Sequence, residues 1–195
     1  MSRKLLTATL LVICVAILYT KESFHSEIAR ALNWFPQSVP STAQIEVGFS
    51  PEAGAEELVI KAIASAKKSI LVGAYSFTSK PIVQGLIDAK KRGVEVRAVL
   101  DKSNTSNKSG TAAANLLANA DIPTRIDSEH PIHHNKIIVI DDAHIETGSF
   151  NYSAAAAHKN AENAVVIWNN PELAKMYADN WAIHWEHSAA YRSTY

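Results

Sequence analysis

Apolar and polar residues follow two alternating rhythms along the chain after residue 43. Helical spacing or an alanine-rich composition marks four segments, 56–68, 81–92, 111–120 and 171–187. Shorter apolar or alternating runs mark seven predicted strands, 44–49, 69–77, 94–100, 122–126, 135–141, 145–150 and 162–168. Because strands and helices mostly alternate, we expect an α/β fold in which a mixed β-sheet is sandwiched between helices.

One predicted strand stands out within this pattern. Residues 137–140 are apolar on both faces, which is typical of a central strand that is covered on both sides. The expected elements all fall within residues 44–195, so we interpret this part of the chain as a single domain.

The first 43 residues have a different character. Arg3 and Lys4 precede an uncharged run at 5–19, which is followed by Lys21, and this order is typical of a signal peptide. The run is shorter than the roughly 20 residues that a membrane span requires. A cleaved signal peptide is therefore our first interpretation, with the domain secreted or periplasmic.

The alternative for the same segment is an uncleaved inner-membrane anchor. The run at 5–19 would then tether the protein, and its basic flank would keep the N-terminus inside and the domain outside. Residues 20–43 contain Pro36 and Pro40 and show no sustained period, so we expect them to form a tether in either case.

Composition excludes two classes of site and favours none. The chain has 19 basic and 19 acidic residues; four of the bases and two of the acids precede residue 44, which leaves the predicted domain with a net charge of −2. The overall charge therefore does not indicate a nucleic-acid-binding protein. The single cysteine, Cys14, lies in the N-terminal run, so the predicted domain has neither disulfides nor cysteine metal sites.

One stretch carries residues suited to phosphate chemistry. His134 and Lys136 are followed after four residues by Asp141, and after six more by Gly148 and Ser149. Alternate side chains of a strand share a face, so His134 and Lys136 should point the same way and Asp141 the other way. An imidazole can attack phosphorus as a nucleophile, and an ammonium group neutralises the non-bridging oxygens.

The residues after the glycine complete this arrangement. Ser149 and Asn151 are two positions apart and can donate hydrogen bonds to the same phosphate oxygens. Asp141 faces away, and we expect it to stabilise the fold by pairing with a base or with backbone N–H groups. With Gly148, it forms the structural part of the motif.

The full pattern, His-x-Lys-x4-Asp-x6-Gly-Ser followed closely by Asn, resembles the HKD motif of the phospholipase D superfamily. It is most similar to the small secreted bacterial endonucleases that carry one such motif. The resemblance runs from about Val47 to the C-terminus and includes segments 74–77 and 165–168. It implies the phospholipase D/nuclease fold, with His134, Lys136 and Glu162 as catalytic residues and Glu162 paired with His134.

The resemblance also implies a reaction. We expect a metal-independent phosphodiesterase without a cofactor, acting as a non-specific endonuclease on DNA, with RNA as a further substrate, through a phosphohistidine. The leaving oxygen needs a proton from the side opposite the nucleophile, and the chain has one motif. A homodimer with a shared active site would supply the second histidine.

Three other functions remain open. The same residues would serve a phospholipase D or cardiolipin-type hydrolase, which an apolar groove beside the site would favour. A binding module with an inactive site and a transferase that passes the intermediate to an alcohol are the other two.

We expect no metal site from the sequence. His133 and His134 are adjacent and should face opposite sides of a strand, and no cysteine in the predicted domain accompanies them as a ligand. The remaining histidines are expected to be surface or packing residues: His130, His144, His158, His184 and His187. Lys90–Arg92 is interpreted as a solvated helix end.

Overall fold

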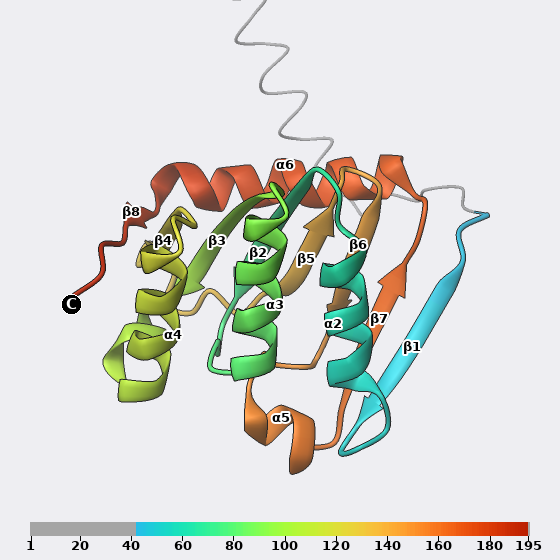
Figure 1. Cartoon of the computed structure of the whole chain (residues 1–195), viewed down its shortest axis with the longest axis horizontal. Helices are drawn as coiled ribbons and strands as arrows, with labels where there is room; N and C mark the ends of the chain where they lie inside the picture. The colour runs from blue at the N-terminus through green and yellow to red at the C-terminus, as the bar shows by residue number, and fades with distance from the viewer. Residues whose placement is uncertain (1–41, 195) are drawn as a thin grey trace, which may run out of the picture. The chain divides into compact units, whose positions relative to one another are not determined.

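The computed structural model describes residues 42–194, so the predicted signal peptide or anchor and its run at 5–19 lie outside the described residues. Within the described part, no helix is both long and apolar enough to cross a bilayer. Figure 1 shows the arrangement of the elements.

The strands form one eight-stranded sheet in the order β1-β7-β6-β5-β2-β3-β4-β8. The strands are β1 (Ile45–Ser50), β2 (Ser69–Ala74), β3 (Glu95–Asp101), β4 (Thr124–Asp127), β5 (Lys136–Ile140), β6 (His144–Gly148), β7 (Glu162–Ile167) and β8 (Ala189–Ala190). Strands β2, β3 and β4 are parallel to one another and the other neighbours are antiparallel. The predicted mixed sheet is confirmed.

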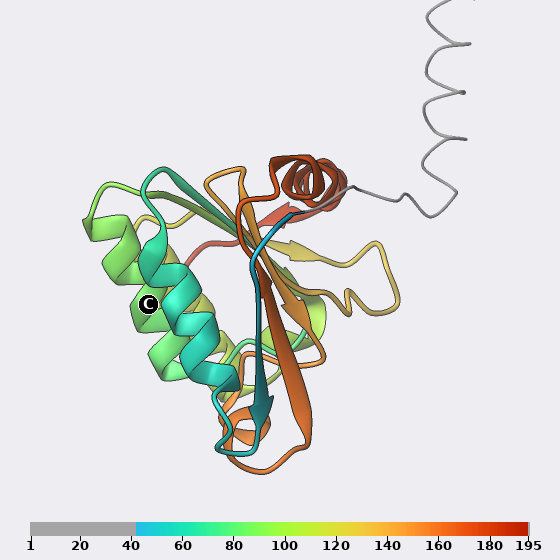
Figure 2. The same cartoon turned by 90° about the vertical axis from the view of Figure 1, so that its right-hand side faces the viewer.

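Helices cover both faces of this sheet, as the sequence predicted. The helices are α2 (Ala55–Ser65), α3 (Lys80–Lys91), α4 (Lys108–Asn119), α5 (Ala154–His158) and α6 (Pro171–His187), with a short 3-10 helix, η1 (Lys102–Ser106). Figures 1 and 2 show α2, α3 and α4 side by side on one face and α6 across the other.

Strand β5 lies between two apolar cores. All five of its residues are buried. Ile138 and Ile140 pack in the main core with α2, α3 and α4, whereas Ile137 and Val139 pack in the smaller clusters beneath α6. The prediction of a doubly covered central strand is therefore confirmed, because an uninterrupted run of apolar residues on a strand needs a core on each face of the sheet.

The ends of the elements differ from the predictions at functionally important places. The strand predicted at 135–141 begins at Lys136, so His134 precedes it, and the strand predicted at 69–77 ends at Ala74. Helix α5 and strand β8 were not predicted; each is short, so neither contains enough residues to show a period.

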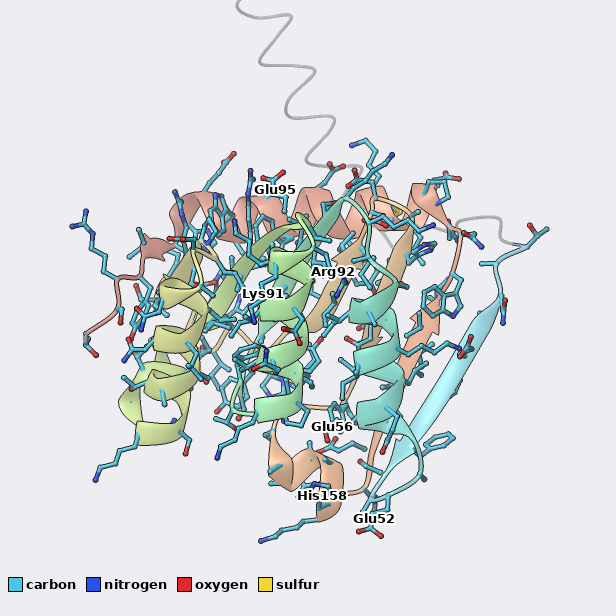
Figure 3. All side chains as sticks on the ribbon, viewed as in Figure 1. Glu52, Glu56, Lys91, Arg92, Glu95 and His158 are labelled. Atoms are coloured by element: carbon cyan, nitrogen blue, oxygen red, sulfur yellow. The ribbon has the colours of Figure 1, made fainter. Side chains whose placement is uncertain are left out.

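The basic run at the end of α3 lies away from α5. Figure 3 shows Lys91 and Arg92 at one end of the helical layer and His158 of α5 at the other. The guanidinium of Arg92 donates hydrogen bonds to the backbone carbonyls of Ile63 and Ala64, and Lys91 forms an ion pair with Asp88 at 3.4 Å. These contacts fit the expected helix end.

Candidate active site

The two halves of the His–Lys–Asp–Gly–Ser pattern meet at one end of the sheet. Lys136 at the start of β5 pairs with Ala74 at the end of β2. On the other side, Ile137 pairs with Thr147, and the next step of this antiparallel register brings Lys136 opposite Gly148. Gly148 pairs in turn with Ala164 of β7. Four neighbouring strands, β7, β6, β5 and β2, therefore bring the predicted residues together at one end of the sheet.

His134 is exposed and lies just before β5. The N–H of Tyr75 donates to the carbonyl of Asn135 at 3.0 Å, which continues the β2–β5 pairing beyond the strand. The His134 imidazole stands 4.8 Å from the Tyr75 ring, centroid to centroid. No hydrogen bond occupies this imidazole within residues 42–194, so both ring nitrogens are available to a substrate.

Lys136 lies beside the same aromatic ring. Its Nζ is 5.2 Å from the centre of the Tyr75 ring and donates to the backbone carbonyl of His134 at 2.8 Å. The residue is 6% exposed, and this burial lowers the pKa of the ammonium, an effect that the charge of Glu162 opposes. His134 and Lys136 thus share a side, as predicted, although His134 is not part of the strand.

The Gly148–Tyr152 segment alternates between core and surface. Phe150 and Tyr152 are fully buried, whereas Ser149 is exposed and Asn151 is half-buried. The two aromatic side chains therefore anchor the segment and turn Ser149 and Asn151 to the other side. The Oδ1 of Asn151 is buried and has no hydrogen-bond partner in the described residues. No hydrogen bond engages the N–H2 group of the same amide within the described residues, so this group can donate to a phosphate oxygen.

Asn163 of β7 holds the Ser149 end of this segment. The carbonyl of Asn163 accepts from the N–H groups of Ser149 and Phe150 at 3.1 Å each. The Ser149 Oγ accepts from the backbone N–H and the side-chain amide of Asn163, at 3.1 and 3.3 Å. With both bonds made at its oxygen, the Ser149 hydroxyl can still donate its proton.

Gly148 is required by close packing. A Cβ atom at this position would lie 2.2 Å from the carbonyl oxygen of Asn163, well inside van der Waals contact. Any larger residue would push β6 and β7 apart next to Ser149. This gives the glycine of the pattern a structural role, as expected.

Asp141 binds three backbone N–H groups at the opposite end of β5. Its carboxylate accepts from Lys67 at 2.9 Å, from Lys68 at 2.7 Å and from Ser69 at 2.9 Å. These bonds lower the pKa of Asp141, although burial acts in the opposite direction and is the largest single effect. The contacts confirm the expected pairing of Asp141 with backbone N–H groups, and Asp141 lies at the end of β5 opposite His134.

Glu162 does not contact His134. It is the first residue of β7, and its Oε1 accepts from the side chain of Asn160 at 3.1 Å. No hydrogen bond joins Glu162 to His134 within the described chain; the residue that feels its charge is Lys136. The pairing of Glu162 with His134 therefore stays a prediction.

A buried carboxyl group, that of Glu146, binds the end of the Gly148–Tyr152 segment. Glu146 of β6 is 0% exposed, and its Oε2 accepts a hydrogen bond from the Tyr152 hydroxyl at 2.6 Å. Burial raises the pKa of Glu146 to about 8, and the bond from Tyr152 offsets only part of this rise. At neutral pH the side chain is therefore mostly protonated and uncharged.

Two features of this region were not predicted from the sequence. Tyr75 contacts both His134 and Lys136, but along the chain β3 and β4 separate it from the motif. Asp127 is surrounded by histidines, and within residues 42–194 this is the one group of three or more His, Cys, Asp or Glu side chains placed to hold a metal ion. None of the predicted active-site residues belongs to this group.

The chain is similar to several known proteins. Residues 59–185 match the family model described as cardiolipin synthase, PLD-like domain. A phospholipase D of Rickettsia bellii is 40% identical over 141 residues, which are 72% of this chain and 69% of the relative. The mitochondrial cardiolipin hydrolase of Danio rerio is 28% identical over 155 residues, 79% of this chain and 64% of the relative.

The fold is also similar to a solved structure of this group. The crystal structure of Nuc from Salmonella typhimurium, a phospholipase D family member, superposes with a TM-score of 0.76 and 48% sequence identity. The match covers 77% of this chain and 99% of Nuc.

Proposed function

The chain belongs to the phospholipase D superfamily and is a phosphodiesterase, and from this premise we propose that it is a metal-independent endonuclease acting on DNA, with RNA as a further substrate. The observation that carries the proposal is the meeting of His134 and Lys136 on the Tyr75 ring. An imidazole without a hydrogen-bond partner in the described residues thus lies beside a largely buried ammonium group at one end of the sheet. A phosphodiester bound there would find a nucleophile and a positive charge together.

The reaction proceeds by two displacements. A ring nitrogen of His134 attacks phosphorus, and the bond from phosphorus to the leaving oxygen breaks, which gives a phosphohistidine and an alcohol. Water then attacks the same phosphorus and frees His134. Lys136, Ser149 and Asn151 neutralise and bind the non-bridging oxygens throughout, since charge develops there in each transition state.

The leaving oxygen must receive a proton from the side opposite His134. We assign this to His134 of a second copy, in a homodimer whose site lies on the twofold axis. An apolar stripe on the edge strand β1 supports association between copies: Ile45, Val47 and Phe49 are 58%, 51% and 57% exposed. Exposed apolar residues in such a row are typical of interaction surfaces.

The preference for nucleic acid rests on similarity to Nuc and to the single-motif endonucleases. His134 is exposed at the end of the sheet where β5 begins, and an extended polymer can reach it there. Glu162 is retained in the proposal as the partner that orients His134 or Lys136.

A lipid phosphodiester is the second candidate, and one feature favours it. A groove of about 440 Å³ lies between α3 and α4, with Val83, Ile87 and Leu116 along it and Lys80 in its lining. Both helices begin at the end of the sheet that carries the site. Acyl chains in this groove would leave a headgroup phosphate near the lysine, and the relatives named phospholipase D and cardiolipin hydrolase are consistent with such a substrate.

One assay separates these functions. The full chain is incubated in excess EDTA with DNA, RNA and phospholipid vesicles containing cardiolipin, and H134A serves as the inactive control. We expect cleavage of DNA and no release of phospholipid headgroups. Hydrolysis of phospholipid alone would assign the lipid function. Loss of DNA cleavage in EDTA that Mg²⁺ restores would contradict the metal-independent mechanism.

A further inference from the structure

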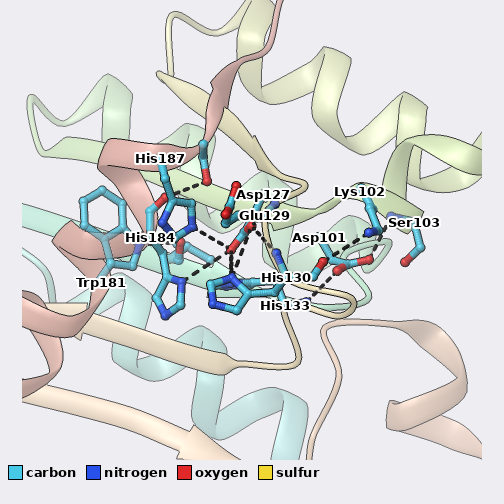
Figure 4. Close-up of polar contacts among 12 residues, drawn as sticks. Asp101, Lys102, Ser103, Asp127, Glu129, His130, His133, Trp181, His184 and His187 are labelled. Carbon is cyan, nitrogen blue, oxygen red and sulfur yellow. Dashed lines mark hydrogen bonds and ion pairs between the residues drawn. The ribbon is translucent and has the colours of Figure 1, made fainter.

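A single carboxylate oxygen lies against four imidazole rings on the α6 side of the sheet. Asp127, the last residue of β4, is 0% exposed. Its Oδ2 lies 3.1 Å from Nδ1 of His130, 3.0 Å from Nδ1 of His133, 3.4 Å from Nδ1 of His184 and 3.1 Å from Nε2 of His187. Figure 4 shows the rings converging on this carboxylate from the turn after β4 and from α6.

Hydrogen bonding alone does not account for this arrangement. A carboxylate oxygen has about two lone-pair positions, so Oδ2 cannot accept from four imidazole N–H groups together. The other oxygen, Oδ1, is already engaged by the backbone N–H groups of Glu129 and His130, at 3.0 and 3.4 Å. The Nδ1 of His184 is buried and has no hydrogen-bond partner in the described residues. More nitrogens face the oxygen than it can bind.

We propose that Asp127, His130, His184 and His187 bind a divalent transition-metal ion of the zinc type. One ligand atom from each of the four lies within 4.8 Å of the others. Zinc bonds of about 2.0–2.2 Å in a tetrahedron put the ligand atoms roughly 3.3 Å apart, and the three N–O distances of 3.1–3.4 Å match this spacing. Imidazole with one carboxylate suits zinc, nickel or copper better than magnesium or calcium.

His133 acts on the site through the carboxylate. Its Nδ1 contacts Asp127 Oδ2 at 3.0 Å, it is 3% exposed, and it is not one of the four grouped ligands. A hydrogen bond of this kind orients a ligating carboxylate and is a common support of metal sites. His133 is therefore a positioning residue of the proposed site.

The two elements that supply the ligands are held in place independently of any ion. On α6, the indole N–H of Trp181 donates to the carbonyl of Val72 at 2.8 Å. Arg125 of β4 donates to the carbonyl of Trp185 at 2.6 Å and lies over its ring. Asp101 accepts from the backbone N–H of His133 at 2.7 Å, which fixes the turn after β4. The ligands thus start close to their final positions.

The site is also accessible. The side chains of His130, His187 and His184 are 45%, 24% and 15% exposed. An ion can therefore enter from solvent past His130, which lies at the outer edge.

The location gives the ion a structural role next to the active site. His130 and His133 lie in the segment 128–133, which leads directly to His134. An ion that joins this segment to α6 would hold the start of the catalytic segment against the sheet. His134 contacts the Tyr75 ring and is not one of the four proposed ligands, so the ion is assigned no part in the attack on phosphorus.

The experiment is zinc binding by the full chain, stripped with EDTA and dialysed into metal-free buffer. Calorimetric titration with ZnCl₂ should give one ion per chain. At a zinc concentration about a hundredfold above the dissociation constant, the melting temperature should rise by about 5–10 °C. Mg²⁺ should give no shift, and Co²⁺ should give the visible absorption of a tetrahedral complex.

Variants assign the ion to the cluster. H130Q and H187Q alter partly exposed side chains, so they should fold, and each should weaken zinc binding about tenfold or more. H158Q, an exposed histidine on α5, and H134A should bind zinc like the wild type. Absence of stoichiometric binding, or binding that H130Q and H187Q leave unchanged, would overturn the proposal. These readouts do not depend on turnover, so they are separate from the test of the nuclease.

Discussion

The side chains of His134 and Lys136, at the end of the sheet, are both positioned against the Tyr75 ring. His134 and Lys136 are two positions apart, and both lie against Tyr75, with Lys136 also bonded to the carbonyl of His134. The backbone bond from Tyr75 to Asn135 keeps the segment extended past the end of β5. The ring therefore fixes the distance between the proposed nucleophile and its neighbouring charge.

Removing either side chain should stop the reaction without unfolding the protein. We expect H134A to lower turnover by more than about 10⁴-fold, because acid–base assistance alone contributes about 10²–10⁴-fold and the nucleophile is lost as well. K136A should lose most activity for want of the positive charge. Steady-state turnover on a phosphodiester substrate, beside thermal unfolding, checks both. H158A is the matched control, and equal losses in it would contradict the assignment.

Asp141 should matter for stability and not for chemistry. D141A removes the acceptor of three backbone N–H groups, and we expect the free energy of unfolding to fall by roughly 2–4 kcal/mol. D142A is a matched control, since Asp141 and Asp142 both have a φ of 54° and alanine is strained equally at each. Denaturant unfolding and turnover per folded molecule are measured together. A D141A protein that is as stable as D142A but inactive would refute this role.

At the scale of the elements, the sequence pattern predicts the main helices and strands because each has a clear period. Helix α6 begins and ends at the predicted residues, with Pro171 at its start and the Asn170 side chain accepting from Leu173. The order of strands in the sheet does not follow from the period, since the pairing of β2 with β5 joins segments far apart in the chain.

Part of the candidate site can likewise be predicted from the sequence, and part cannot. The spacing of His134, Lys136 and Gly148 is local and is visible in the sequence. The contribution of Tyr75 and the cluster around Asp127 are not, because they arise where separate elements meet. His187 lies 60 positions from Asp127, and no spacing rule connects a turn after a strand with the last turn of a helix.

The pair formed by Glu146 of β6 and Tyr152 predicts a pH dependence of stability. Burial raises the pKa of Glu146 from 4.5 to about 8 in the folded protein. Below about pH 4.5 both states are protonated and the stability of the buried neutral acid is fully present. As pH rises toward 8, only the unfolded chain ionises, so this stability is progressively lost.

E146Q should remove this dependence, because its amide oxygen still accepts from the Tyr152 hydroxyl and has no proton to lose. We expect the advantage of E146Q over the wild type to grow between pH 5 and pH 8 with a slope of up to about 1.4 kcal/mol per pH unit. Denaturant unfolding at several pH values measures it. E172Q, an exposed change on α6, should run parallel to the wild type. A parallel curve for E146Q would mean that Glu146 is ionised when buried.

At the scale of the whole molecule, the proposed shared active site depends on what one chain offers and what it lacks. It has one exposed motif histidine at the end of the sheet and an apolar stripe on β1 at the edge. His133 cannot supply the second role, since it is 3% exposed and its Nδ1 contacts Asp127. A second copy of the chain is the simplest source of an acid on the far side of phosphorus.

Subunit mixing tests the shared site. Wild-type and H134A chains are combined in varying ratios, allowed to exchange, and assayed, with exchange confirmed by the masses of the dimers. A mixed dimer retains one His134 and lacks either the nucleophile or the acid in every orientation of the substrate, so it should not turn over. Activity per total protein should therefore fall as the square of the wild-type fraction.

A linear fall after confirmed exchange would mean that each chain acts alone. The acid would then belong to the same chain, with Glu162 and His130 as the first candidates. Because His130 also lies in the histidine cluster, zinc would inhibit the enzyme if His130 were that acid, and would leave turnover unchanged if Glu162 were.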